Sequence, residues 1–488
     1  MPAILALDQG TTGTTALVVD QDGSVLGRGY REITQHYPEP GLVEHDAEEI
    51  LESAVSAMRE AVAAAGVQPQ ALGITNQRET VVVWDRSTLH AVGPAIVWQD
   101  RRTSERCRQL REQGCEPLIR ERTGLVLDPY FSATKLEWIL ENTPGYLPHT
   151  GPLAFGTVES WLVARLTGGC HVTDHTNASR TLLYNLATRD WDAELLELFG
   201  IPMEVMPRIV PSSGIVEETD PDLLGFSIPI AGLAGDQQAA LFGQGCVAPG
   251  LAKNTYGTGA FLLSYLGETP PPEPIPGILT TAACGPRGEP ALALEGSLFI
   301  AGAAIQWLRD GLGIIAAAGE TERLARSVAD TAGVTFVPAF TGLGTPHWEP
   351  EARGTITGLT RGTTRAHLVR AALESMAFGT MDLVNAMEPA APIELLRVDG
   401  GASANDWLLQ SQADLLGRPV ERPDQIETTA LGAAALAGIA TGVWSSLDEF
   451  LASRRFVRFD PGLDEAERGV RKSEWDRAVR AALAWARG

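Results

Sequence analysis

The sequence predicts an α/β protein made of two related domains around a central cleft. Segments typical of strands are mixed with segments typical of helices in both halves, which favours α/β layers over an all-β fold. A length of 488 residues also exceeds what one hydrophobic core usually supports. Two acidic, glycine-bearing turns, at residues 7–12 and 234–238, each follow an apolar run. Such turns can hold a cation together with the phosphate oxygens that it neutralises.

Three strands are expected at the start of the chain. Apolar residues flank the glycine- and threonine-rich turn at residues 10–14, so a strand is expected on each side of it. The Asp22-Gly23 pair is a hairpin signal, and it leads into a third strand near residues 25–27. Asp8 therefore stands at the end of a strand, beside backbone amides that could approach phosphate. The turn is not a P-loop, because no Gly-Lys-Ser/Thr sequence follows it.

A long amphipathic helix is expected over residues 47–65. Asp46 can cap its first turn, Glu49 stands at the capping-box position, and Gly66 provides the stop. Apolar residues recur along it at helical spacing and predict one face packed on a core. The side chains of that face are Leu51, Val55, Met58 and Val62.

A polar loop, residues 76–79, separates two expected strands at residues 71–75 and 81–84. It contains Arg78 and Glu79, a pair that could grip several hydroxyl groups at once, since arginine donates hydrogen bonds and glutamate accepts them. A surface ion pair is the alternative interpretation. Carbon-bound hydrogens of a polyol also need an apolar wall, and core packing is the alternative role for each candidate. The candidates for that wall are Trp98, Tyr130 and Phe261.

The second half repeats the theme of a strand that ends in an acidic turn. Residues 228–232 lead to Asp236 and Gln237, and a helical stretch follows. A turn at residues 254–259 mirrors the first glycine- and threonine-rich turn. A carboxylate in the position of Asp236 could accept a hydroxyl proton during phosphoryl transfer, with a helix cap as the alternative.

The C-terminal part offers a candidate for close approach to adenosine and a closing helix. Gly400 and Gly401 follow an expected strand and open a helix, where the lack of side chains lets a ligand come near. Residues 464–488 are expected to form an amphipathic helix. Its apolar side chains are Val470, Trp475, Val479, Leu483 and Trp485. The domain boundary is expected to divide the chain into residues 1–245 and 246–488.

Composition excludes several classes of partner. The formal net charge of −23 repels nucleic acid and anionic membranes, so neither is an expected partner. No apolar run is long enough to span a bilayer, and no secretory signal precedes the first strand. The five cysteines are scattered without the spacing of a zinc site or a disulfide framework. These features fit a protein of the reducing cytoplasm.

Several longer motifs together resemble the FGGY family of carbohydrate kinases, most closely the members that phosphorylate glycerol. Residues 128–138 are similar to the first family signature, and residues 354–375 to the second. The similarity to the glycerol-phosphorylating members rests on five further segments and runs nearly end to end. These segments are residues 73–80, 96–99, 173–180, 235–243 and 253–259.

The resemblance implies two actin-like, ribonuclease-H-like ATPase domains around a central cleft, with ATP, Mg²⁺ and glycerol as ligands. The first domain would hold glycerol and phosphate, and the second would hold adenosine. Asp236 would be the catalytic base, and Asp8 and Asp236 would lie near the metal. The implied glycerol contacts are Arg78, Glu79, Trp98, Tyr130, Asp236, Gln237 and Phe261. The implied ATP contacts are Thr11, Thr12, Gly13, Thr258, Gly302, Gln306, Gly401 and Asn405.

Some features depart from the family pattern, and alternatives stay open. Thr15 stands where family members often carry an arginine, so one phosphate contact is missing. Residues 217–226 lack a loop that binds fructose 1,6-bisphosphate, and no histidine for phosphorylation lies between Pro207 and Gln244. Relatives are often dimers or tetramers, so a homo-oligomer is expected by analogy. The alternatives are a kinase for another polyol or ketose, and a non-kinase actin-like ATPase.

Overall fold

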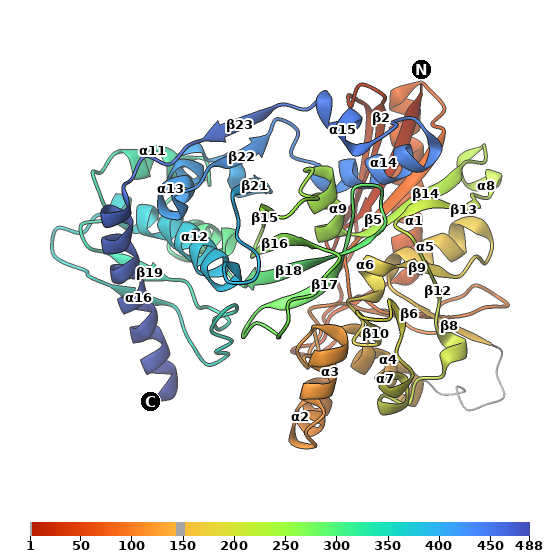
Figure 1. The fold of residues 1–488 in the computed structure, drawn as a ribbon, viewed down its shortest axis with the longest axis horizontal. Helices are drawn as coiled ribbons and strands as arrows, with labels where there is room; N and C mark the ends of the chain where they lie inside the picture. The colour runs from red at the N-terminus through yellow and green to blue at the C-terminus, as the bar shows by residue number, and fades with distance from the viewer. Residues whose placement is uncertain (1, 143–151) are drawn as a thin grey trace.

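Two mixed β-sheets, one in each half of the chain, organise the computed structural model, which describes residues 2–142 and 152–488. In Figure 1 the first sheet lies on the right with the N-terminus, and the second lies toward the centre and left. Helices pack on both sheets. The predicted α/β architecture with two domains is confirmed.

The first sheet has six strands and combines an antiparallel meander with two parallel strands. β1 pairs antiparallel with β2, β2 pairs antiparallel with β3, and β5 lies parallel to both β1 and β14. In spatial order the strands are β13 (Ser213–Glu218), β14 (Pro229–Gly235), β5 (Ala71–Asn76), β1 (Ala3–Gln9), β2 (Gly13–Asp20) and β3 (Val25–Glu32). The three strands predicted at the start of the chain are therefore present.

The second sheet has seven strands and repeats that pattern. β15 pairs antiparallel with β16 and parallel with β21, as β1 does with β2 and β5. In spatial order the strands are β17 (Leu279–Cys284), β18 (Pro290–Leu298), β16 (Ala260–Gly267), β15 (Leu251–Tyr256), β21 (Leu395–Asp399), β22 (Val420–Pro423) and β23 (Phe456–Phe459). The predicted turn at residues 254–259 is shorter than expected, because residues 254–256 continue β15. Backbone pairing with β16 holds all three residues in the sheet, and residues 254 and 255 also pair with β21.

Short strand pairs and helices surround the sheets. The two-stranded pairs are β4 (Glu44–His45) with β7 (Ala95–Ile96), β6 (Val82–Asp85) with β8 (Leu153–Gly156), β9 (Val172–Asp174) with β12 (Arg208–Val210), β10 (Tyr184–Asn185) with β11 (Asp190–Trp191), and β19 (Thr335–Val337) with β20 (Thr355–Thr357). The helices of the first half are α1 (Ala47–Ala65), α2 (Ser104–Glu112), α3 (Glu116–Thr123), α4 (Ser132–Asn142), α5 (Val158–Thr167), α6 (His175–Ala178), α7 (Ala193–Leu198), α8 (Pro221–Leu224) and α9 (Asp236–Gly243). Those of the second half are α10 (Gly302–Gln306), α11 (Glu320–Arg326), α12 (Arg365–Met387), α13 (Asp406–Leu416), α14 (Thr428–Thr441), α15 (Leu447–Ala452) and α16 (Glu465–Arg487). The single turns η1 (Met203–Val205) and η3 (Gly401–Ala404) are 3₁₀ helices, and η2 (Trp307–Gly311) is a π-helix.

Helix α1 begins and ends where the sequence predicts. The Asp46 carboxylate accepts hydrogen bonds from the backbone N–H groups of Glu48 and Glu49, and Gly66 ends the helix in the left-handed conformation. Its apolar face packs on the first sheet, with Met58 fully buried and Val62 only partly buried.

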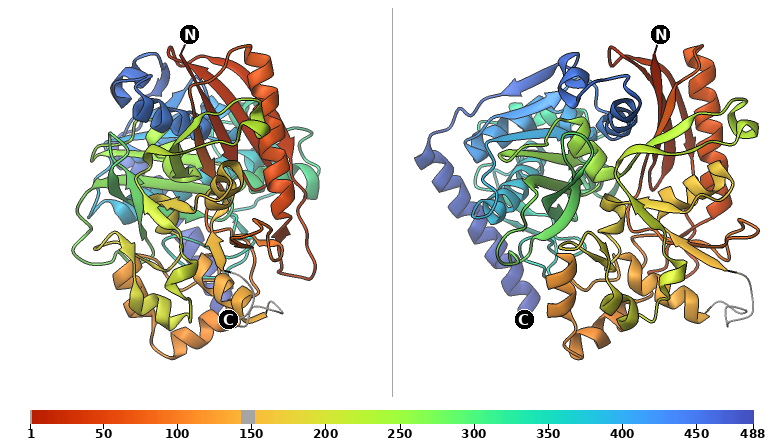
Figure 2. Two further views of the ribbon diagram at one scale, coloured as in Figure 1. Left: turned by 90° about the vertical axis from the view of Figure 1, so that its right-hand side faces the viewer. Right: turned by 45° about the vertical axis from the view of Figure 1, so that its right-hand side comes forward.

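Helix α14 belongs to the second half of the sequence but packs on the first sheet. It contacts β1, β5, β13 and β14 on the face opposite α1. Figures 1 and 2 show α14 and α15 lying against the N-terminal strands rather than among the other C-terminal helices. The domain boundary at residue 245, which was expected from the sequence, remains a prediction. In space, residues 428–452 complete the core of the first sheet.

Helix α16 covers the second half with only part of its predicted apolar face. Trp475 and Val479 are buried, and the Trp475 ring stacks on Phe378 with a centroid distance of 5.1 Å. Val470 and Trp485, two of the apolar side chains named for this helix, are instead 63% and 64% exposed. No helix within residues 2–142 and 152–488 combines the length and the apolar character that crossing a membrane requires.

Candidate functional site

Three parallel strands of the first sheet bring the predicted acidic and basic residues to one edge. Asp8, near the end of β1, pairs with Thr75 of β5. Gly235, the last residue of β14, pairs with Asn76 of β5. Because the carboxyl ends of parallel strands share one edge of a sheet, Arg78 just beyond β5 and Asp236 just beyond β14 both emerge beside Asp8.

Asp236 is the first residue of α9 and contacts Arg78. The Nε atom of Arg78 lies 3.2 Å from Oδ1 of Asp236. The same Oδ1 accepts a hydrogen bond of 2.7 Å from the backbone N–H of Gln237. The Asp236 side chain keeps 31% of its surface exposed, whereas that of Arg78 keeps 2%. Asp236 thus combines a fixed orientation with one face open to a ligand.

The carboxylates of Asp8 and Asp236 influence each other. Burial and, to a lesser extent, the negative charge of Asp236 together raise the pKa of Asp8 to about 7. Two carboxylates that repel one another at a partly open edge match the donor set that a hard divalent cation prefers. Among residues 2–142 and 152–488, no three histidine, cysteine or acidic side chains cluster so as to hold a metal ion.

Glu79 is held in a buried network of charges. Its backbone is left-handed, with φ of 63°, a conformation that residues with side chains adopt rarely and mostly at functional sites. Arg180 donates a hydrogen bond of 2.6 Å from Nε to Oε1 of Glu79. Burial raises the pKa of Glu79 more than the adjacent guanidinium groups of Arg180 and Arg78 lower it. The predicted alternative of a surface ion pair is wrong, since Arg78 and Glu79 are both buried.

The aromatic candidates of the first half stand next to the phosphate turn. The indole Nε1–H of Trp98 donates a hydrogen bond of 2.9 Å to Oγ1 of Thr11. The rings of Trp98 and Tyr130 meet edge to face, with centroids 5.6 Å apart. Phe261, from the second half, is partly buried on β16 opposite Thr255. The first two residues thereby join the predicted acceptor wall to the predicted phosphate turn.

A buried lysine fixes Gln237. The Nζ atom of Lys253 donates hydrogen bonds to Oε1 of Gln237 and, at 2.9 Å, to Oγ1 of Thr255. Burial lowers the pKa of Lys253 to about 8, against the opposing effect of Asp399 and Asp236. Lys253 therefore ties α9 to strand β15 of the second sheet.

The predicted nucleotide contacts form a second group around the β15–β16 turn. The backbone N–H of Gly302 donates a hydrogen bond of 3.0 Å to the carbonyl of Gly257, and that of Ala301 donates one of 2.8 Å to the carbonyl of Thr258. A Cβ atom on Gly400 would lie 2.4 Å from the carbonyl oxygen of Tyr256, so only glycine permits this approach.

The remaining candidates lie on exposed or capping positions. Gly401 has open space where a Cβ would stand, and Asn405 caps α13 by accepting from the backbone N–H of Leu408. Gln306 is exposed at the end of α10. In the first sheet, Thr12 is exposed at the tip of the β1–β2 turn. Across residues 2–142 and 152–488, no hydrogen bond joins the Thr11–Gly13 turn to this second group.

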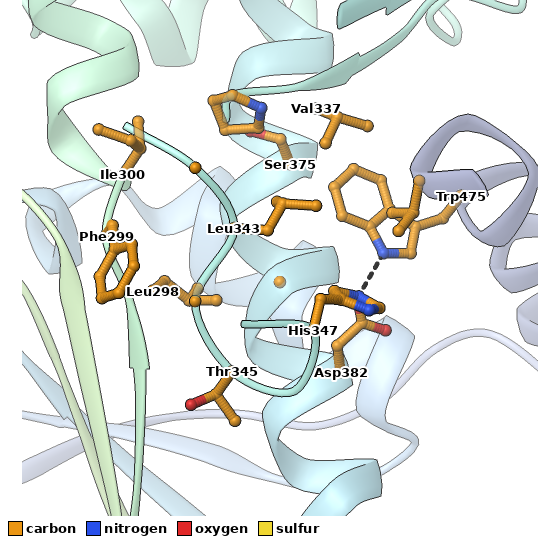
Figure 3. Close-up of a pocket in the computed structure, with 15 residues that line it drawn as sticks. Leu298, Phe299, Ile300, Val337, Leu343, Thr345, His347, Ser375, Asp382 and Trp475 are labelled. Carbon is orange, nitrogen blue, oxygen red and sulfur yellow. Dashed lines mark hydrogen bonds between the residues drawn. The ribbon is translucent and has the colours of Figure 1, made fainter. Parts of the chain in front are cut away.

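A small cavity lies apart from both groups. Figure 3 shows side chains that line it, among them Leu298, Leu343 and Trp475. Its volume is about 40 Å³. The Trp475 indole donates a hydrogen bond of 2.7 Å to Asp382, whose pKa burial raises to about 6. None of the predicted site residues lines this cavity. Residues of α12, of α16 and of the segment that leads into Gly302 line it.

The sequence matches two family models that together cover most of the chain. The model of the N-terminal domain of the FGGY family of carbohydrate kinases matches residues 3–243, and that of the C-terminal domain matches residues 252–441. The chain belongs to the FGGY family of carbohydrate kinases.

Similar proteins cover this FGGY kinase nearly end to end. A glycerol kinase of Aromatoleum aromaticum is 55% identical over 99% of both chains, and one of Carboxydothermus hydrogenoformans is 54% identical over 99% of this chain and 98% of its own. Among solved structures, that of Plasmodium falciparum glycerol kinase with ADP is 36% identical, with a TM-score of 0.93 over 99% of this chain and 98% of the other. A xylulose kinase structure from Rhodospirillum rubrum is 26% identical, with a TM-score of 0.86 over 99% and 98%.

Three buried charged residues of this FGGY kinase, Arg180, Lys253 and Glu295, join the site although the sequence alone did not indicate their roles. Arg180 and Lys253 lie within motifs that carry the family resemblance, but nothing in their spacing shows which partners they meet. Glu295 is a lone charge within the apolar run of β18. This lone charge could have indicated from the sequence that Glu295 takes part in a buried ion pair, because a carboxylate in such a strand needs a cationic partner from elsewhere in the fold.

Proposed function

We propose that this FGGY kinase transfers the γ-phosphoryl group of ATP to glycerol and produces sn-glycerol 3-phosphate and ADP. The observation that carries the proposal is the pairing of Asp236 with Arg78 at the edge where β1, β5 and β14 end. The names of the relatives at 54–55% identity support glycerol as the acceptor.

Glycerol is bound by polar groups that are already oriented. Arg78 donates hydrogen bonds to its hydroxyl groups, Glu79 accepts them, and Gln237 is held in place by Lys253. Trp98, Tyr130 and Phe261 contact the carbon-bound hydrogens. Because these groups are fixed before glycerol enters, its terminal hydroxyl meets the phosphorus at little further loss of entropy.

Asp236 acts as the catalytic base. The hydroxyl oxygen of glycerol forms a bond with the γ-phosphorus while the bond from that phosphorus to the bridging oxygen of ADP breaks. The hydroxyl proton passes to the Asp236 carboxylate. Positioning and electrostatic stabilisation supply most of the rate enhancement, since the transition state is loose and asks for little covalent chemistry.

The phosphates and the adenosine of ATP contact the two groups of residues from different halves. Thr11, Thr12 and Gly13 offer hydroxyl and amide donors to the phosphates. Adenosine lies where Gly401 leaves open space. The contacts on the side of the second half are Thr258, Gly302, Gln306, Gly401 and Asn405.

Asp8 and Asp236 are the residues that would hold Mg²⁺. Mg²⁺ bound there would neutralise the phosphate oxygens, and it would also relieve the repulsion that raises the pKa of Asp8. The proposed homo-oligomer rests on analogy with relatives, and size-exclusion chromatography with light scattering tests it. The proposed cytoplasmic location rests on the free cysteines.

The decisive experiment measures ADP release from MgATP with and without glycerol. We expect turnover to depend on glycerol, with little ATP hydrolysis in its absence because water is a poor substitute for a bound acceptor. A panel of polyols and ketoses, xylulose included, distinguishes glycerol from the acceptors of other FGGY kinases. Nucleotide turnover that no small alcohol changes would instead favour a non-kinase ATPase.

A further inference from the structure

Glu295 is a buried carboxylate of the second half that reaches the acceptor residues of the first. It lies on β18, where it pairs with Leu263 of β16 and Leu279 of β17, and its side chain is fully buried. A carboxylate in such a strand is stable only when cations take up its hydrogen-bonding capacity. The cations come from the first half of the chain.

Two arginines share this one carboxylate. Arg78 donates from Nη1 to Oε2 at 2.6 Å and from Nη2 to Oε1 at 3.1 Å, a bidentate fork. Arg180 donates from Nη2 to Oε1 at 2.9 Å. Burial acts to raise the pKa of Glu295, but the two guanidinium groups outweigh it and lower the pKa to about 2. Glu295 is therefore charged at every pH at which the enzyme works.

Each arginine directs its Nε atom toward the acceptor site. With both Nη atoms on Glu295, Arg78 presents Nε to Asp236 at 3.2 Å. Arg180 presents Nε to Glu79 at 2.6 Å, and its Cζ lies 5.7 Å from the ring centroid of Tyr130. Glu295 is thus the common anchor of the groups that orient the base and the acceptor.

We infer that Glu295 is a positioning residue for the acceptor. From the second half of the chain it orients Arg78 directly, and it orients Glu79 through Arg180. This inference rests on the proposed function. It explains why a strand of the second sheet, far from the acceptor residues in sequence, carries a lone charge. It also makes productive acceptor binding depend on the docking of β17 and β18 against the first half.

That docking has further contacts which do not involve Glu295. Gln238 donates from Nε2 to the carbonyl of Ala282 at 3.0 Å, and the backbone N–H of Ala282 donates to Oγ of Ser179 at 3.1 Å. The backbone N–H of Thr280 donates to the carbonyl of Gly124 at 3.0 Å. A variant without the Glu295 charge therefore keeps β17 in place and loses the orientation of the two arginines.

The test compares Glu295→Gln with the wild-type enzyme in steady-state kinetics. Glutamine has the same length, but it offers one oxygen where the carboxylate offers two. We expect kcat/KM for glycerol to fall by about a hundredfold, the effect of misplacing reacting groups by about 1 Å. The KM for ATP should stay within about twofold, because in the described part of the chain none of the residues proposed to contact ATP hydrogen-bonds to Glu295, Arg78 or Arg180. Glu295→Asp keeps the charge, so it should recover part of the loss if it reaches one arginine.

Glu289→Gln, an exposed position beyond β17 on the same hairpin, is the matched control and should behave as the wild type. Retained ADP binding and an unchanged circular dichroism spectrum show that each variant is folded; should Glu295→Gln fail this check, the comparison rests on Glu295→Asp. A folded variant whose kcat/KM for glycerol equals that of the wild type overturns the inference. A folded variant whose KM for ATP rises as much as its KM for glycerol overturns it as well. Failure of the proposed function can be told apart from failure of this inference, because it would already be seen in the wild-type enzyme as turnover that does not depend on glycerol. If the wild type phosphorylates another polyol, the same comparison is made with that acceptor.

Discussion

The Nε atom of Arg78 lies 3.2 Å from Oδ1 of Asp236, although the two residues are 158 positions apart along the chain. The pairing arises because β5 and β14 are parallel neighbours whose ends share an edge. It places a permanent positive charge beside the proposed base. The contact orients the carboxylate and leaves its other oxygen free for the hydroxyl of the acceptor.

Replacing the proposed base tests its role. We expect Asp236→Asn to lower the glycerol-dependent kcat by about a hundredfold to ten-thousandfold, the usual contribution of general-base catalysis. The KM for ATP should change little, because Asp236 receives the proton and other residues contact the nucleotide. Coupled ADP detection measures both constants. Asp222→Asn, on the exposed helix α8, serves as control; near-normal turnover of Asp236→Asn would remove Asp236 from this role.

Asp8 should make the ligand-free protein less stable at high pH. Its folded-state pKa of about 7 exceeds the ordinary value of 3.8, so the folded state holds a proton that the unfolded state releases between these values. Stability from this group is present below pH 3.8 and is lost as pH rises to 7. Asp8→Asn should therefore raise the free energy of unfolding at pH 8 by on the order of 2 kcal/mol.

Thermal unfolding of wild type and Asp8→Asn at several pH values measures that effect. The advantage of the variant should shrink as pH falls from 7 toward 4, where Asp8 is protonated in the folded wild type. The variant should also lose kinase activity, since one of the two carboxylates proposed for Mg²⁺ is gone. A stability difference that is independent of pH would contradict the raised pKa.

Lys135 should be needed to shape the turn that presents Tyr130. Its Nζ donates three hydrogen bonds, of 2.8, 2.7 and 2.8 Å, to the carbonyls of Pro129, Tyr130 and Phe131. Lys135→Met leaves these carbonyls without a donor, so we expect a loss of about 3 kcal/mol in the free energy of unfolding. The KM for glycerol should rise as Tyr130 moves.

Lys472→Met provides the comparison for Lys135→Met in chemical denaturation and in kinetics. The Lys472 side chain is 43% exposed and forms an i,i+4 pair with Asp476 on α16. Such a pair contributes only about 0.5 kcal/mol, so its loss should change stability little. Equal effects of the two substitutions would show that the three carbonyls do not depend on Lys135.

Gly73 should be essential for the packing of α14 on the first sheet. A Cβ atom at this position would lie 2.1 Å from the carbonyl oxygen of Ala433, a backbone atom that cannot move aside. We expect Gly73→Ala to lower the free energy of unfolding by about 3 kcal/mol through overpacking. Gly93→Ala is the control, since nothing lies within 4 Å of its added Cβ. A Gly73→Ala protein as stable as the control would mean that α14 can shift without loss.

Local elements could be predicted from the sequence because their signals are local. Asp46 and Gly66 define α1 to the residue, since capping depends on hydrogen bonds within one turn. The sequence indicated less about which side chains of α16 are buried. Helical spacing places Val470 and Trp485 among its apolar residues, but it does not tell whether another element covers them. The fold-class prediction is confirmed, but the prediction of one acidic turn in each domain is wrong: β1, which carries Asp8, and β14, which leads to Asp236, both belong to the first sheet.

Sequence by itself determined the types of residue available for the chemistry and their places at strand ends: Asp8, Arg78 and Asp236 each follow or close an apolar run. Only the tertiary structure decided which of them meet. It brought Glu295 from β18 onto Arg78 and Arg180, and it placed α14 on the sheet of the other half. The reason is physical: hydrogen-bond and charge partners that lie far apart in the chain are selected by sheet order and burial, and one sequence does not reveal these before it folds.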